Sequence, residues 1–243
     1  MGGRSRLRNE AELGRGKATR SPRACILVVC EGRKTEPQYL KALCRSIRLH
    51  TVEVRIVGQG AEVLGVVDAA KTLKEEREEA AGPSVGLTPF DEVWCVVDTE
   101  GPGDRTSWEQ GSSRATALGF RLAWSNPCFE YWLLLHFERI GRSFPGYAAL
   151  RPFLTKYLPH YNKSEDCFEK LAPNVPIAIE NAKHVQRSQW QDTPRPIDRN
   201  PGTTVHELVE RLLEVAETTI AEYRKLCPTP KTGPRKARRP KPT

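Results

Sequence analysis

The sequence lacks any long apolar run. No stretch of about 18 consecutive apolar residues occurs, although a helix that crosses a bilayer needs roughly that length. The first 23 residues are polar and basic, and no apolar segment follows them until Ala24, which argues against a secretory signal. We therefore expect a cytoplasmic protein without a membrane partner.

Paired cysteines are also missing. The seven cysteines are odd in number, and none forms a C-x-x-C pair, the spacing typical of zinc sites and redox centres. Several lie within or beside apolar runs, namely Cys25, Cys30, Cys95 and Cys128. This distribution favours buried free thiols in a reducing compartment over disulfides or zinc ligands.

Acidic residues are absent from the last 20 positions, which carry eight Lys and Arg. Residues 1–23 carry seven Arg and Lys against two Glu, so the two ends together hold a charge of +13. The net charge of the whole chain is +8, which leaves residues 24–223 at −5. We predict that 1–23 and 227–243 are disordered basic tails, which either contact a nucleic-acid backbone or are simply solvated.

Two motifs of nucleotide-binding folds, the G-x-G-x-x-G turn and the Walker A loop, do not occur. What the chain does contain is an alternation of short apolar runs with helical patterns. Runs typical of buried strands cover about 26–30, 92–98 and 120–124, and the alternating run at 52–57 predicts a strand nearer the edge of the sheet. Helical patterns follow each of them. This order predicts an α/β domain over 24–140, with a mostly parallel four-stranded sheet flanked by helices.

A mainly helical extension is predicted over 141–226, packed on the α/β domain. Partial helix is expected within 141–162, two short helices within 164–190, and one final helix over 203–225 with an apolar stripe. No motif assigns a function to 141–200, which we interpret as an insertion that faces a partner or the substrate.

Carboxylates stand where three of the predicted strands end. Glu31 follows the first strand, Asp98 ends the third, Glu100 comes two residues later, and Glu130 lies shortly after the fourth. Ligands of open α/β sheets bind beyond the carboxyl ends of the strands, so we expect these side chains to converge. Clustered carboxylates repel one another unless a cation lies among them, and oxygen ligands suit Mg²⁺ or Mn²⁺.

Each of these residues also has a structural interpretation. Glu31 can be a turn carboxylate paired with Arg33 or Lys34, and Glu130 can be favoured by the dipole of a buried helix. Alternatively, Arg33, Lys34 and the following helix N-terminus are groups that could grip a phosphate. His136 is interpreted as a core histidine with satisfied hydrogen bonds.

Four blocks in sequence order resemble the RloB-like family, which accompanies bacterial restriction and abortive-infection loci. They read VCEGRKTEPQY at 29–39, VVDTE at 96–100, SNPCFEYWLLLHF at 125–137 and NPGTTV at 200–205. The family is related to the Toprim fold of topoisomerases, primases and OLD-type nucleases. The resemblance therefore implies a Toprim-like sheet, with a metal-binding Glu after its first strand and a D-x-D after its third.

The resemblance implies roles for individual residues. Glu31 matches the first metal-binding acid, and Asp98 with Glu100 matches the D-x-D, with Glu in place of the second Asp. Glu130 would be a further acid for a second ion, and Lys163 would reach the substrate phosphate. The expected cofactor is Mg²⁺ or Mn²⁺.

The implied activity is that of a Mg²⁺-dependent endonuclease acting as a toxic effector in anti-phage defence. Glu31, Asp98 and Glu100 would be catalytic, while Arg33 and Lys34 neutralise phosphate oxygens. The expected partners are nucleic acid, either RNA including tRNA or DNA, and an AAA- or ABC-type ATPase. A non-catalytic partner of nucleic acid or of the ATPase, and a nucleotidyl transferase, are the alternatives, and the oligomeric state is left open.

Overall fold

The computed structural model describes residues 24–56, 62–81, 87–99, 105–191, 193 and 195–228. The predicted basic tails therefore lie outside the described residues, apart from Cys227 and Pro228. Glu100, the second acid of the predicted metal motif, also lies outside them.

The described part of the chain forms a five-stranded sheet in the order β2-β1-β3-β4-β5. The strands are β1 (Ile26–Cys30), β2 (Val52–Ile56), β3 (Glu92–Asp98), β4 (Arg121–Asn126) and β5 (Gly202–Thr203). The first four are parallel, and β5 is antiparallel to β4. The predicted mostly parallel α/β architecture is confirmed, with one short strand that the sequence did not indicate.

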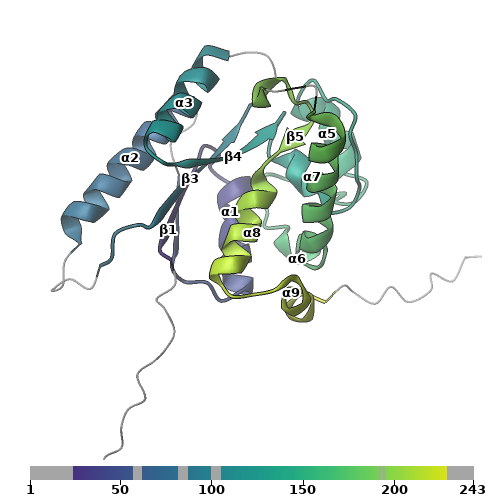
Figure 1. The fold of residues 1–243 in the computed structure, drawn as a ribbon. Helices are drawn as coiled ribbons and strands as arrows, with labels where there is room; N and C mark the ends of the chain where they lie inside the picture. The colour runs from purple at the N-terminus through teal and green to yellow at the C-terminus, as the bar shows by residue number, and fades with distance from the viewer. Residues whose placement is uncertain are drawn as a thin grey trace, which may run out of the picture.

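Helices cover both faces of the sheet (Figure 1). On one face, α2 (Val63–Ala80) and α3 (Arg105–Ala117) pack on Leu27, Val29, Cys95 and other side chains of that face. On the other, α1 (Thr35–Ser46), α4 (Glu130–Leu135) and α8 (Val205–Val215) pack on Ile26, Val28 and their neighbours. Because alternate strand residues point to opposite faces, strands covered on both sides are apolar at every position.

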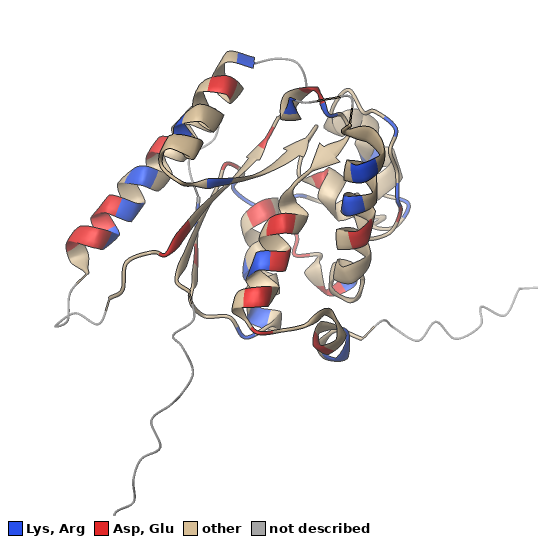
Figure 2. Ribbon diagram, viewed as in Figure 1, with Lys and Arg blue, Asp and Glu red and all other residues tan. Residues whose placement is uncertain are grey.

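The outer surface of these helices is charged. Figure 2 shows acidic and basic residues along α2, where Lys71 pairs with Glu75 and Lys74 with Glu78. Exposed pairs at this spacing contribute only about 0.3–0.5 kcal/mol each to a helix. The face of α2 that carries them is the solvated side of the domain.

The extension after α4 is mainly helical and returns to the sheet at its end. It comprises α5 (Tyr147–Leu154), α6 (Phe168–Leu171), the 3-10 turn η1 (Ala172–Asn174), α7 (Val175–Gln189), η2 (Pro196–Asp198), β5, α8 and α9 (Ile220–Leu226). No helix within the described ranges is long and apolar enough to span a membrane.

The single final helix predicted over 203–225 is wrong, because the chain breaks between α8 and α9. Glu217 adopts a left-handed conformation with φ 55°, which ends α8. Thr219 then caps α9 through a capping box with Glu222. α8 and α9 each contain part of the apolar stripe. The 3.6-residue period therefore continues across the break, which is why the sequence predicted one helix.

Candidate functional site

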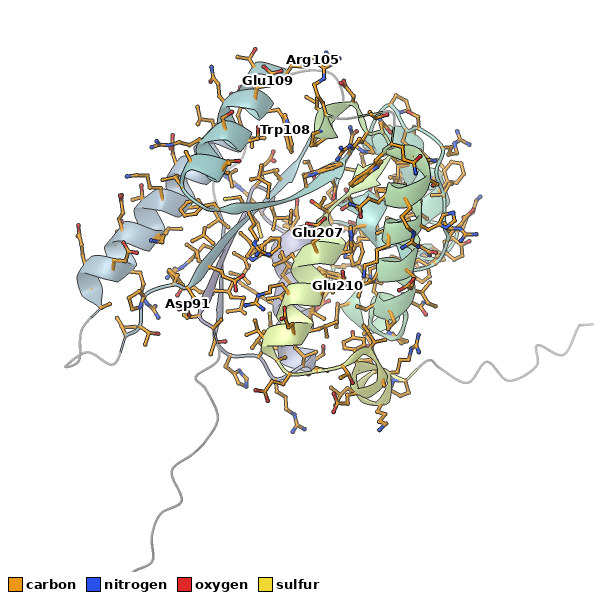
Figure 3. The ribbon with its side chains drawn as sticks, viewed as in Figure 1. Asp91, Arg105, Trp108, Glu109, Glu207 and Glu210 are labelled. Atoms are coloured by element: carbon orange, nitrogen blue, oxygen red, sulfur yellow. The ribbon has the colours of Figure 1, made fainter. Side chains whose placement is uncertain are left out.

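The carboxyl ends of β1, β3 and β4 meet at one edge of the sheet and bring three predicted acids together. Glu31 directly follows β1, Asp98 is the last residue of β3 and pairs in register with Ser125 of β4, and Glu130 opens α4. Asp91, labelled in Figure 3, precedes β3 and marks the opposite end of that strand. The parallel arrangement thus places the acids where the sequence predicted them.

Glu31 is held to the neighbouring strand by two hydrogen bonds. Its backbone N–H donates to Val96 O at 3.0 Å, which extends the β1–β3 pairing by one residue. Its side-chain Oε2 accepts from the backbone N–H of Asp98 at 3.1 Å. The Glu31 carboxylate is therefore fixed beside Asp98 by the backbone of β3.

Asp98 lies among other acids. Burial, and then the charges of Glu36, Glu130 and Glu31, raise the pKa of its carboxyl group well above the usual range. Its Oδ1 is covered from solvent and has no hydrogen-bond partner among the described residues. An unsatisfied buried carboxylate oxygen is costly, so a group that binds there would relieve that cost.

Glu36, which no strand-end pattern indicated, joins this cluster. It lies in the first turn of α1, and burial together with the charges of Glu130 and Glu31 raises its pKa to about 7. A Cβ on Gly32 would lie 2.1 Å from Glu36 Oε2, so the carboxylate occupies the space that the glycine leaves open. We call Glu31, Glu36, Asp98 and Glu130 the acidic centre.

Glu130 is the most enclosed member of the acidic centre, with 1% of its surface exposed. Its Oε1 accepts from Tyr161 OH at 3.0 Å and lies 3.2 Å from Lys163 Nζ, while Oε2 is buried without a partner within the described ranges. Burial lowers the pKa of Lys163, but the Glu130 carboxylate outweighs that effect and holds the pKa above its usual value.

The segment around Lys163 also contacts the turn after β1. Lys34 Nζ donates to Ser164 Oγ at 2.6 Å, and Thr35 Oγ1 lies 3.3 Å from Tyr161 OH. Arg33 in the same turn is exposed. The structure thus brings Lys163, a predicted phosphate ligand, to the acidic centre and Lys34 to the neighbouring Ser164. It also adds Tyr161, which no sequence motif indicated.

The acidic centre has the donor chemistry of a divalent-cation site. Carboxylate oxygens suit Mg²⁺ or Mn²⁺, and Asp98 Oδ1 and Glu130 Oε2 are buried without a hydrogen-bond partner in the described part of the chain. No group of three or more His, Cys, Asp or Glu among the described residues is arranged to hold a metal ion, however. The predicted metal role of Glu31, Asp98, Glu100 and Glu130 stays a prediction.

The remaining sequence-based interpretations concern buried residues. His136 is a core histidine, with Nδ1 3.0 Å from Trp132 O and Nε2 3.1 Å from Tyr39 OH, as predicted. All seven cysteines are free, and Cys30, Cys44, Cys95 and Cys128 are buried. Asn126 donates from Nδ2 to Ile197 O at 2.9 Å.

Comparison with known proteins identifies the family. Searches of curated proteins and of solved structures return no significant match. The family model described as RloB-like protein matches residues 26–212, which span the sheet, the acidic centre and the extension up to α8. The chain belongs to the RloB-like family.

Proposed function

We propose that this protein is a metal-dependent nuclease of the Toprim type, which hydrolyses phosphodiester bonds in nucleic acid. The observation that carries the proposal is the acidic centre. Burial and the charges of neighbouring acids raise the pKa of Glu36 and Asp98, and Asp98 Oδ1 and Glu130 Oε2 are buried without a hydrogen-bond partner within the described residues. A cluster of buried carboxyl groups with raised pKa values is typical of a functional site and is costly in a purely structural role.

In this proposal Glu31 and Asp98 would hold the cation, with Glu100 and Glu130 as further oxygen ligands. A bound Mg²⁺ or Mn²⁺ supplies charge stabilisation at the scissile phosphate and lowers the pKa of water. Arg33, Lys34 and Lys163 neutralise phosphate oxygens at the rim of the acidic centre. Lys163 is already drawn toward the centre by its 3.2 Å contact with Glu130 Oε1.

A proton acceptor is available within the same cluster. The pKa of Glu36 is raised to about 7, the range in which a carboxylate exchanges a proton most effectively at neutral pH. Glu31 is the second candidate, because its carboxylate is positioned by the Asp98 backbone N–H. Either residue would take the proton of the attacking water.

We extend the proposal to the biological role that the family resemblance implies. The nuclease would be an effector of bacterial anti-phage defence, paired with an AAA- or ABC-type ATPase and located in the cytoplasm. RNA, including tRNA, and DNA are the substrate classes to be compared.

The test is a cleavage assay with total tRNA and with plasmid DNA, in the presence of Mg²⁺, Mn²⁺ or EDTA. We expect cation-dependent cleavage that Asp98→Asn lowers by about 100-fold or more, since the substitution removes a ligand charge at the scissile phosphate. Glu109→Gln is the matched control, because Glu109 is an exposed acid on α3 (Figure 3).

Activity that is equal in wild type, Asp98→Asn and Glu109→Gln would exclude the proposed site. Thermal unfolding of the three proteins shows whether a loss of cleavage reflects a loss of structure. If wild type is inactive alone, the same assay with the neighbouring ATPase tests whether the enzyme requires its partner.

A non-catalytic role in binding the ATPase or nucleic acid is the second candidate. It is favoured by the lack, among the described residues, of three side chains arranged around a metal, and by the contact that places Lys163 against Glu130. If Glu31→Ala and Asp98→Ala both keep full biological toxicity, this role replaces the enzymatic one.

A further inference from the structure

The segment 139–163 differs in charge from the rest of the folded chain. It contains five cations and no Asp or Glu, whereas residues 24–223 as a whole carry a net charge of −5. The five are Arg139, Arg142, Arg151, Lys156 and Lys163, and all of them are exposed. Among the described residues, the first four have no carboxylate within ion-pair distance.

Aromatic rings alternate with these cations. The Arg142 guanidinium lies 4.7 Å and Lys156 Nζ 4.6 Å from the centre of the Phe153 ring. Tyr157 stacks on Phe137 with ring centres 4.9 Å apart and planes within 3°. Tyr157 is 40% exposed, so its outer face is available for a further flat ring. We call these five cations with Tyr147, Phe153 and Tyr157 the basic-aromatic surface.

The basic-aromatic surface reaches the acidic centre through Lys163. Its Nζ lies 4.5 Å from the centre of the Tyr147 ring, at the start of α5, and 3.2 Å from Glu130 Oε1. The Glu130 charge also contributes to raising the pKa of the Tyr147 hydroxyl, after burial, which places Tyr147 near the acid. Lys163 and Tyr147 therefore connect the start of α5 to the acidic centre.

We propose that the basic-aromatic surface binds single-stranded nucleic acid and guides it to the acidic centre. Cations without carboxylate partners attract the phosphate backbone, and exposed aromatic faces stack on bases. Base faces are accessible in single strands, loops and ends, but they are covered by their neighbours in a regular duplex. The inference rests on the proposed function and specifies its substrate as an unpaired strand.

Fluorescence anisotropy with a fluorescein-labelled single-stranded oligonucleotide and its duplex, in EDTA, measures binding without cleavage. We expect the full-length protein to bind the single strand more tightly. Arg151→Ala with Lys156→Ala should weaken single-strand binding about tenfold. It should also lower the slope of log K against log salt concentration (the salt slope) by about 1.4, since each phosphate contact contributes about 0.7. Arg224→Ala with Lys225→Ala removes the same charge from exposed positions on α9 and should change neither quantity.

Stacking is tested separately from charge at Tyr157. Tyr157→Ala should weaken single-strand binding about tenfold, because stacking on one aromatic ring contributes about 1–3 kcal/mol per base. Tyr157→Phe keeps the ring and should bind like wild type. Thermal unfolding of both variants shows whether a loss of binding reflects a loss of structure, since Tyr157 also stacks on Phe137.

Equal affinity of wild type for single strand and duplex, or equal loss in the Arg151/Lys156 and Arg224/Lys225 double variants, would overturn the proposal. The same holds if all variants bind like wild type, as they would if this surface served an acidic protein partner. The outcome is independent of the proposed nuclease activity. If the Arg151/Lys156 variant loses binding and wild type does not cleave even with the ATPase present, the surface is kept and the nuclease is rejected. If wild type cleaves but the Arg151/Lys156 variant binds like wild type, the nuclease is kept and the surface is rejected.

Discussion

At the scale of single residues, His136 shows how burial fixes a protonation state. Because Trp132 O can only accept, His136 Nδ1 donates to it, and Nε2 accepts from the Tyr39 hydroxyl. Both contacts use the neutral ring. Burial lowers the pKa of His136 to about 4 from an ordinary value near 6.5.

This lowered pKa predicts a loss of stability in acid. The unfolded chain takes up a proton near pH 6.5 and the folded chain only near pH 4, so the free energy of unfolding should fall between those values. The contribution of His136 is on the order of 3 kcal/mol. Denaturant unfolding of wild type and His136→Gln between pH 4 and 8 measures it, and equal pH profiles for the two proteins would contradict the assignment.

Residues of the acidic centre differ in how far the sequence indicated them. Glu31, Asp98 and Glu130 follow buried strands, so the parallel sheet alone predicts that they converge. Glu36 belongs to a helix, and only the open space over Gly32 lets its side chain fold back to the centre. Tyr161 contacts Glu130 across 31 positions of the chain, a distance that no local pattern encodes.

At the scale of elements, the break between α8 and α9 depends on one cap. Thr219 Oγ1 accepts from the backbone N–H of Glu222 at 3.2 Å, and the backbone N–H of Thr219 donates to Glu222 Oε2 at 2.8 Å. The cap orients α9 so that Tyr223 is fully buried against the core.

Removing this cap should destabilise the protein. Thr219→Ala is expected to lower the free energy of unfolding by about 1 kcal/mol, because a helix N-terminal N–H loses its acceptor. Thr219→Ser keeps the hydroxyl and should restore most of the loss. Urea unfolding of the three proteins is the measurement, and an alanine variant as stable as wild type would show that the cap is not needed.

Elements formed by local periodicity were predicted well, and those formed by distant contacts were not. The apolar strands β1, β3 and β4 and helices α1 to α3 follow from sequence patterns of a few residues each. Strand β5 has two residues, and its pairing with Ser125 and Asn126 of β4 bridges more than 75 positions of sequence. A strand that short carries no periodic pattern of its own.

At the scale of the whole molecule, charge is separated between the folded domain and the chain ends. Residues 24–223 carry −5, while the last 20 residues carry eight Lys and Arg. Residues 229–243, which lie outside the described part, contain six of those cations and no acid. Their attraction to nucleic acid would be long-ranged and independent of sequence.

Deleting residues 229–243 should therefore weaken binding to every polyanion rather than to one substrate. With about 0.7 lost from the salt slope per cation that contacts a single strand, the slope should fall by up to about 4. In the truncated protein, the Arg151/Lys156 double variant should still bind single strands more weakly than the Arg224/Lys225 double variant. Anisotropy over a range of salt concentrations measures both effects, and an unchanged slope would assign the tail no contact with nucleic acid.

Thr203 and Thr204 lie beside β4 and hydrogen-bond to its backbone. Thr204 Oγ1 accepts from the Trp124 N–H at 3.0 Å, and the Thr204 N–H and Thr203 Oγ1 donate to Trp124 O at 2.9 and 3.0 Å. These contacts occupy backbone groups of an apolar strand that would otherwise stand at the edge of the sheet. An uncovered edge of this kind is a template for strand addition by a second chain, so Thr203 and Thr204 protect the protein from aggregation through β4.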